Sequence, residues 1–118
     1  MSTANVSLPD RSLPRIGETA PEFEAKSTQG LIRLSDFKGK WVMLFSHPAD
    51  FTPVCSTEFM AFARRFSDFQ ALNVQPIGVS IDSVFSHIAW VRSMEEMGGA
   101  KIPFPILADL DMKVARSF

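Results

Sequence analysis

The chain has 118 residues, of which 46% are hydrophobic and 21% charged, and its formal net charge is −1. These values are ordinary for one globular domain with a modest core. The charge offers no basic surface for nucleic acid, and no apolar run approaches the roughly 18 residues of a membrane span. The single cysteine leaves no disulfide candidate, which favours a reducing compartment, most simply the cytoplasm.

The N-terminal third predicts an arm followed by a hairpin and a strand. Residues 1–15 are polar without a secretory signal, so we expect a flexible arm preceding a single domain, 16–118. Residues 23–37 predict a β-hairpin that turns at Thr28-Gln29-Gly30. The apolar run from Trp41 to Ser46 predicts a buried strand.

A helix should follow, because apolar residues recur at helical spacing from Phe59 through Phe66 to Leu72. Residues 74–81 are nearly all apolar, which indicates a central parallel strand. The next helix should be capped by Asp82 or Ser83 and end at Gly98-Gly99. Its apolar stripe runs through Val84, Ile88, Val91 and Met94 and reaches Met97.

The alternation of strands and helices favours an α/β layer architecture. We find no repeat, no low-complexity tract and no domain linker.

Cys55 lies where a strand gives way to a helix. Thr52 before Pro53 is a good helix start, with threonine as N-cap and proline at the first helical position. Cys55 would then occupy the third position, where free backbone N–H groups and the helix dipole favour a thiolate, the nucleophilic form. A simpler interpretation is a small buried apolar residue, with Thr52 only a cap and Pro48 only a strand breaker.

Together, Pro48, Thr52 and Cys55 form the spacing Pro-x-x-x-Thr-x-x-Cys, which resembles the peroxiredoxin motif. The surrounding residues are most similar to the one-cysteine branch of that family and its archaeal relatives. Three further segments resemble family landmarks in the same order: residues 17–23, residues 79–83 with His87 and Trp90, and residues 103–109. The similarity therefore extends from about Ile16 to the last residue.

The resemblance implies a thioredoxin-like, three-layer α/β fold and a thiol-dependent peroxidase that uses no cofactor. Cys55 would attack hydrogen peroxide or an organic hydroperoxide and become a sulfenic acid. The Thr52 hydroxyl would hydrogen-bond sulfur and peroxide, and Pro48 would shield the pocket from water. An external thiol, small or on a thioredoxin-like protein, would regenerate Cys55, and a complete domain would form a homo-oligomer.

The chain departs from the family pattern at its C-terminal end. An arginine from a later strand completes the family's pocket, and this chain ends before that strand. Arg116 is better interpreted as a solvated helix residue than as a substitute. The closing strands of the fold would also be absent, leaving strand 41–46 with an open edge. The domain is therefore expected to be C-terminally truncated, and a resolving cysteine could lie beyond Phe118.

Two interpretations of function therefore stand, an active thiol peroxidase and a catalytically weak fragment that acts as a binding or subunit-interaction module. Neither involves a metal, because His47 and His87 are far apart in the chain and no second cysteine is available. His47 either tunes the cysteine pocket or bonds backbone at a strand end, and His87 is expected to pack. Glu58 either resembles the family residue that bonds the arginine or is a favourable charge in the first helical turn.

Overall fold

The computed structural model describes residues 13–98 and 101–118. In that part of the chain, five strands form one mixed sheet in the order β2-β1-β5-β4-β3. The strands are β1 Glu24–Ser27, β2 Gly30–Arg33, β3 Trp41–Ser46, β4 Val74–Ser80 and β5 Ile106–Ala108. The helices are a 3-10 turn η1 Leu34–Phe37, α1 Pro53–Arg64, α2 Phe66–Ala71, α3 Val84–Gly98 and α4 Lys113–Ser117.

The pairing of the strands confirms the predicted order of elements. β1 and β2 form the expected antiparallel hairpin, with Ser27 opposite Gly30 at the turn. β4 runs parallel to both β3 and β5 and lies between them, which explains its nearly continuous apolar sequence. Of the predicted arm, residues 13–15 lie within the described part, and residues 1–12 lie outside it.

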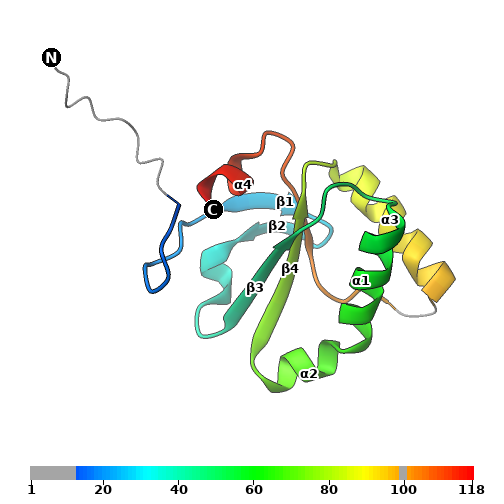
Figure 1. The fold of residues 1–118 in the computed structure, drawn as a ribbon, viewed down its shortest axis with the longest axis horizontal. Coiled ribbons are helices and arrows are strands. Elements are labelled where there is room, and N and C mark those ends of the chain that lie inside the picture. Colours follow the sequence, from blue (N-terminus) through cyan, green and yellow to red (C-terminus); the bar gives the residue numbers. More distant parts are fainter. Residues whose placement is uncertain (1–12, 99–100) are drawn as a thin grey trace, which may run out of the picture.

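Two apolar clusters cover the two faces of the sheet. In Figure 1, α1 and α3 lie on one side of the sheet and α4 on the other. On one face, Phe59 of α1 and Trp90 of α3 pack against Ile106. On the other face, Val114 of α4 packs with Leu107, and half-buried η1 side chains join them. Adjacent residues of β5 thus point to opposite clusters, as strand geometry requires. The predicted three-layer α/β architecture is confirmed.

The helix predicted to continue toward Leu72 is instead two helices that meet at Arg65. Its backbone N–H bonds the carbonyls of both Ala61 and Phe62, and its φ of −101° and ψ of 13° leave the helical range. A shared N–H of this kind is common at helix ends. α2 then starts in a new direction, and Leu72 is 70% exposed rather than part of the core.

The buried side of α3 also differs from the predicted stripe. Of the predicted residues only Met94 is buried, beside His87 and Trp90, which lie outside the predicted stripe. The predicted Val84, Ile88 and Val91 are half-buried and Met97 is exposed. The apolar pattern misses this because histidine is polar by type, yet here it lies in the interior. The cap is as predicted, since the Ser83 hydroxyl accepts the backbone N–H of Ser86. The predicted stop falls at Gly98, and Gly99 lies outside the described residues.

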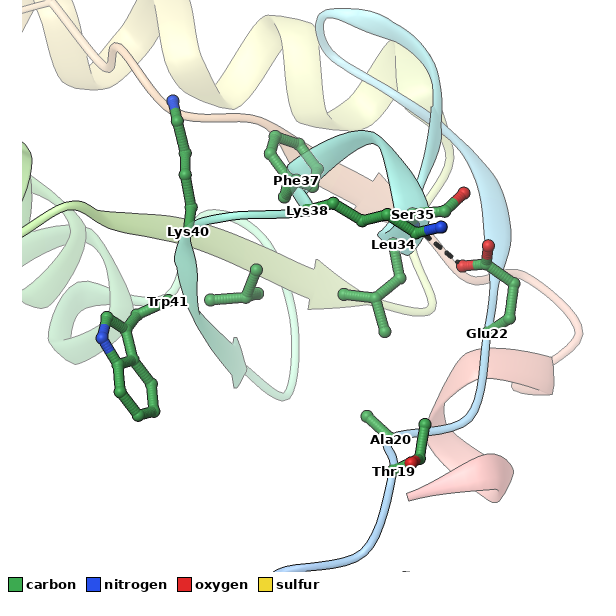
Figure 2. A pocket seen from close by; sticks show the side chains of 10 residues that line it. Thr19, Ala20, Glu22, Leu34, Ser35, Phe37, Lys38, Lys40 and Trp41 are labelled. Atoms are coloured by element: carbon green, nitrogen blue, oxygen red, sulfur yellow. Dashed lines mark hydrogen bonds between the residues drawn. The ribbon is translucent and has the colours of Figure 1, made fainter.

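Within the described residues, β3 pairs only with β4, so its other edge is open as expected. Beside the first residues of β3 lies a groove of about 470 Å³ (Figure 2). Glu22 lines it and accepts the backbone N–H of Ser35, while Trp41 at its rim is 75% exposed. The groove lies at the opposite end of β3 from His47, so it is separate from the cysteine motif.

Candidate active site

Cys55 lies at the third position of α1 and is buried, with 6% of its surface exposed. Thr52 is the N-cap and Pro53 the first helical residue, as predicted. The first backbone bond of the helix runs from the Ser56 N–H to the Thr52 carbonyl, 3.0 Å. The N–H groups of Val54 and Cys55 therefore precede the helical bonding pattern, where they can support a negative charge.

The Thr52 side chain does not cap the helix. Its hydroxyl donates to the Ala49 carbonyl at 3.1 Å, so its oxygen is left with lone pairs that can accept a hydrogen bond from a thiol or a peroxide. Pro48 is exposed and follows the buried His47 directly, which places it on the outer side of the loop. In that same loop, Phe51 adopts a φ of +66°, the left-handed conformation that turns the chain toward α1.

Ser56 ties the cysteine turn to α3. Its hydroxyl donates to the Thr52 carbonyl at 2.9 Å and accepts the indole N–H of Trp90 at 2.9 Å. Trp90 and Cys55 belong to the same buried cluster, together with Phe59. The turn that carries the sulfur is thus held by hydrogen bonds and by aromatic packing.

A buried polar network lies beside this cluster. The Nε2–H of His47 donates to Oδ1 of Asp50 at 2.7 Å, and the Nδ1–H of His87 donates to Oδ2 of Asp50 at 2.7 Å. The Ser86 hydroxyl donates to the same Oδ2 at 2.9 Å. The Asp50 backbone N–H donates to Asp82, whose carboxylate also accepts the Ser80 hydroxyl. The network thus joins the ends of β3 and β4 to α3.

Burial by itself would raise the pKa of Asp50. The hydrogen bonds from His47, His87 and Ser86, together with the positive charge on His87, outweigh it and hold that pKa well below its usual range. Asp50 is therefore a carboxylate at neutral pH, although its side chain is only 2% exposed.

The His47 ring lies against the same aromatic residues that pack on Cys55. Its centroid is 4.9 Å from that of Phe59 and 4.7 Å from that of Trp90. Its Nδ1 atom is buried and has no hydrogen-bond partner among the described residues. The ring does not bond backbone, so the backbone alternative for His47 is wrong, and a place within the site stays open to it.

The possible metal ligands of the site already bond one another. Ligand atoms of His47, Asp50, Asp82 and His87 lie within 4.8 Å of one another, although the two histidines are far apart in sequence. The 2.7 Å contacts from both rings to Asp50 leave room for a proton and not for an ion. A metal would require these bonds to open, so the set fits a hydrogen-bonded network better.

Two other predicted candidates lie outside this constellation. Arg116 is exposed on α4, which packs against the face of the sheet opposite Cys55, so it is a surface residue as expected. Glu58 is exposed in the second turn of α1, and the first turn holds no acidic residue. The suggestion of a favourable first-turn charge is therefore wrong.

The sequence pattern predicted neither the site role of Asp50 nor the bond between Ser56 and Trp90, and it indicated Asp82 only as a helix cap. Asp50 and His87 lie far apart in the chain and meet because β3 and β4 are parallel neighbours that place their carboxyl-terminal ends together. The one available signal was the pair of polar residues Ser86 and His87 in the apolar first half of α3.

Known proteins share this arrangement over most of the chain. Residues 16–118 match the AhpC/TSA family. A peroxiredoxin of Aquifex aeolicus is 60% identical over 108 residues, which cover 91% of this chain and 49% of the relative. A peroxiredoxin of Thermoplasma volcanium is 59% identical over 103 residues, covering 87% and 51%. The chain thus spans about half the length of the curated relatives it matches.

Solved structures agree with the sequence relatives. A yeast mitochondrial 1-Cys peroxiredoxin superposes with a TM-score of 0.83 at 43% identity, over 87% of this chain and 49% of that one. Peroxiredoxin 6 of Arenicola marina gives 0.81 at 38% identity, over 86% and 48%. The predicted thioredoxin-like fold is therefore confirmed, and the chain belongs to the AhpC/TSA family, the peroxiredoxins.

Proposed function

We propose that this chain is part of a thiol-dependent peroxidase that reduces hydrogen peroxide and organic hydroperoxides. Cys55 is the nucleophile, and Thr52 and Pro48 belong to its site. The observation that supports this most directly is the place of Cys55 in the first turn of α1, three residues after the N-cap Thr52 and buried in a cluster of aromatic rings. The family membership supports the same chemistry.

In the first step the Cys55 thiolate attacks the terminal oxygen of the peroxide. A sulfur–oxygen bond forms, the oxygen–oxygen bond breaks, and the sulfur is oxidised to a sulfenic acid while the leaving alkoxide or hydroxide takes up a proton. The free N–H groups at the start of α1 would stabilise the thiolate. Thr52 would have to release Ala49 before its hydroxyl could donate to the developing charge.

Regeneration needs a thiol from outside these 118 residues, among which Cys55 is the one cysteine. A first thiol condenses with the sulfenic acid to form a mixed disulfide and water, and a second thiol releases Cys55 and leaves as a disulfide. The yeast mitochondrial relative resolves its thiol through glutathione and thioredoxin systems. By analogy we expect a small thiol or a thioredoxin-like protein here, a homo-oligomeric assembly, and a reducing compartment such as the cytoplasm.

None of the described helices is long and apolar enough to cross a membrane. No step of the proposed cycle requires a membrane surface or nucleic acid.

The test is a comparison of Cys55→Ser and Thr52→Val with the unchanged chain in a coupled peroxide-consumption assay with excess dithiol. Cys55→Ser should abolish turnover, and Thr52→Val should slow it strongly while Cys55 remains available for alkylation. Equal rates for all three proteins would refute the proposal.

A second candidate is a catalytically weak chain that serves as a subunit-interaction module. The open edge of β3 and the half-length coverage of relatives favour it. Size-exclusion chromatography separates the two: the module predicts a tight complex or aggregates, whereas the peroxidase predicts a clean monomer or a symmetric oligomer.

A further inference from the structure

The hydrogen bonds of the polar network around Asp50 specify which ring nitrogens of His47 and His87 carry protons. Asp50 is ionised, and an ionised carboxylate only accepts hydrogen bonds. Three donors reach its two oxygens, from His47, His87 and Ser86. The ring nitrogens that face it, Nε2 of His47 and Nδ1 of His87, must therefore both carry protons.

The second nitrogen of His87 also faces an acceptor. Its Nε2 lies 2.8 Å from the backbone carbonyl oxygen of Leu107 in β5, and a carbonyl has no proton to give. Both nitrogens of His87 must therefore donate, which makes the ring an imidazolium ion. The His87 side chain is fully buried, and burying such a charge is tolerated only where it is paired and hydrogen-bonded, as Asp50 provides.

The second nitrogen of His47 is in the opposite situation. Its Nδ1 is buried without a partner in the described part of the chain, whereas Nε2 is held by Asp50. A proton on Nδ1 would be a buried donor without an acceptor, which is costly. No carboxylate bonds this Nδ1, because Asp50 is paired with His87 and bonds Nε2, and Asp82 accepts the Asp50 N–H and the Ser80 hydroxyl. The neutral Nε2–H form of His47 with a free Nδ1 lone pair is therefore favoured.

We propose that His87 is a doubly protonated positioning residue that, through Asp50, holds His47 in its neutral Nε2–H form with Nδ1 free to accept a proton beside the Cys55 turn. The groups facing the His87 ring come from three elements. Asp50 and His47 follow β3, Asp82 follows β4 and bonds the Asp50 backbone, and Leu107 belongs to β5. The kinetic consequence for Cys55 rests on the proposed function, whereas the proton positions do not.

The chain contains only two histidines, so nitrogen NMR of the ¹⁵N-histidine-labelled protein at neutral pH resolves both rings directly. We expect two ring N–H groups on His87, with slow exchange, and a single one, on Nε2, for His47. A neutral His87 with one ring proton would overturn the proposal, as would a His47 protonated on Nδ1. This measurement uses the unchanged chain and needs no variant to fold.

Two variants then separate charge from hydrogen bonding. His87→Asn keeps a donor near Nδ1 and removes the charge, so His47 should take up a second proton at neutral pH. In Asp50→Asn, the amide N–H₂ can donate to Nδ1 of His87, so that nitrogen should lose its proton and His87 should show one ring N–H signal instead of two. The amide oxygen still accepts from His47, which should keep its Nε2–H. Ser86→Ala is the matched control, because it removes a neutral donor to the same Asp50 oxygen and should leave both rings unchanged.

The rate of sulfenate formation at Cys55, followed against pH, links the network to chemistry. His87→Asn should shift the rate profile to higher pH, because His47 then holds an extra proton at neutral pH. An unshifted profile in a variant whose His47 is doubly protonated would overturn the positioning role. A chain that shows the expected proton positions but no fast sulfenate would refute the proposed function and leave the assignment of protons intact.

Discussion

The indole N–H of Trp90 donates a 2.9 Å hydrogen bond to the hydroxyl of Ser56, the residue that directly follows Cys55. This bond joins the middle of α3 to the first turn of α1. Both residues are buried, and Trp90 has only 1% of its surface exposed. If one of the two partners is removed, water therefore has little access to the polar group of the other. The orientation of the cysteine turn thus depends on α3 as well as on its own helix.

Replacing Trp90 by Phe keeps a buried ring but removes the donor. We expect a loss of about 1–3 kcal/mol in the free energy of unfolding, from the lost hydrogen bond and the smaller ring. Urea unfolding measures it. Ser56→Ala is the partner variant, and the double variant should lose less than the sum of the two single losses. Additive losses would mean that the bond contributes nothing.

The low pKa of Asp50 predicts that the free energy of unfolding decreases at acid pH. Its pKa in the folded state lies below the ordinary value of 3.8, so the folded state binds the proton more weakly than the unfolded state does. The stabilisation is therefore complete above about pH 4 and is lost as the pH falls toward the folded-state pKa. Asp50→Asn should be less stable at neutral pH and should lose less stability between about pH 6 and pH 3. Unfolding by urea at several pH values provides the measurement, and parallel pH curves for the two proteins would contradict this expectation.

Gly78 in β4 allows the sheet and α1 to approach closely. A Cβ atom there would lie 2.9 Å from Cζ of Phe59, a ring that is itself buried and cannot move aside. Gly78→Ala should therefore cost about 1–3 kcal/mol through overpacking. Gly98→Ala is the control, because its Cβ would meet only the flexible Met60 side chain. Thermal unfolding should show a clearly larger loss for Gly78→Ala; equal losses would refute the packing argument.

The open edge of β3 predicts association between chains. The Trp41 N–H bonds the carbonyl of Asn73, directly before β4, and the His47 N–H bonds that of Val79 in β4. By strand alternation the Ser46 N–H therefore points to the open edge. Ser46→Pro removes that donor without removing a bond to β4, and it should reduce concentration-dependent association. Ser46→Ala keeps the N–H and should associate like the unchanged chain. Light scattering over a concentration series distinguishes them, and equal association of both variants would exclude the edge as the contact.

Local signals predicted the elements and the position of Cys55 well. Thr52 and Pro53 specify the start of α1 through their own backbone preferences, and this needs no knowledge of distant residues. The break at Arg65 could not be predicted, because the apolar spacing continues through it and only the packing of α2 interrupts the helix. Likewise, the Asp50–His87 contact depends on the register of β3 and β4, which periodicity does not specify.

The most direct test of the proposed chemistry is the rate at which Cys55 forms a trapped sulfenate with one equivalent of hydrogen peroxide at neutral pH, read by mass spectrometry. We expect a rate at least about ten times that of an unstructured cysteine peptide, a barrier lower by about 1.4 kcal/mol. We also expect Thr52→Val to lose this advantage. A rate no faster than that of the peptide would contradict the proposed role of Cys55 and show that the motif in this chain does not assemble a working site.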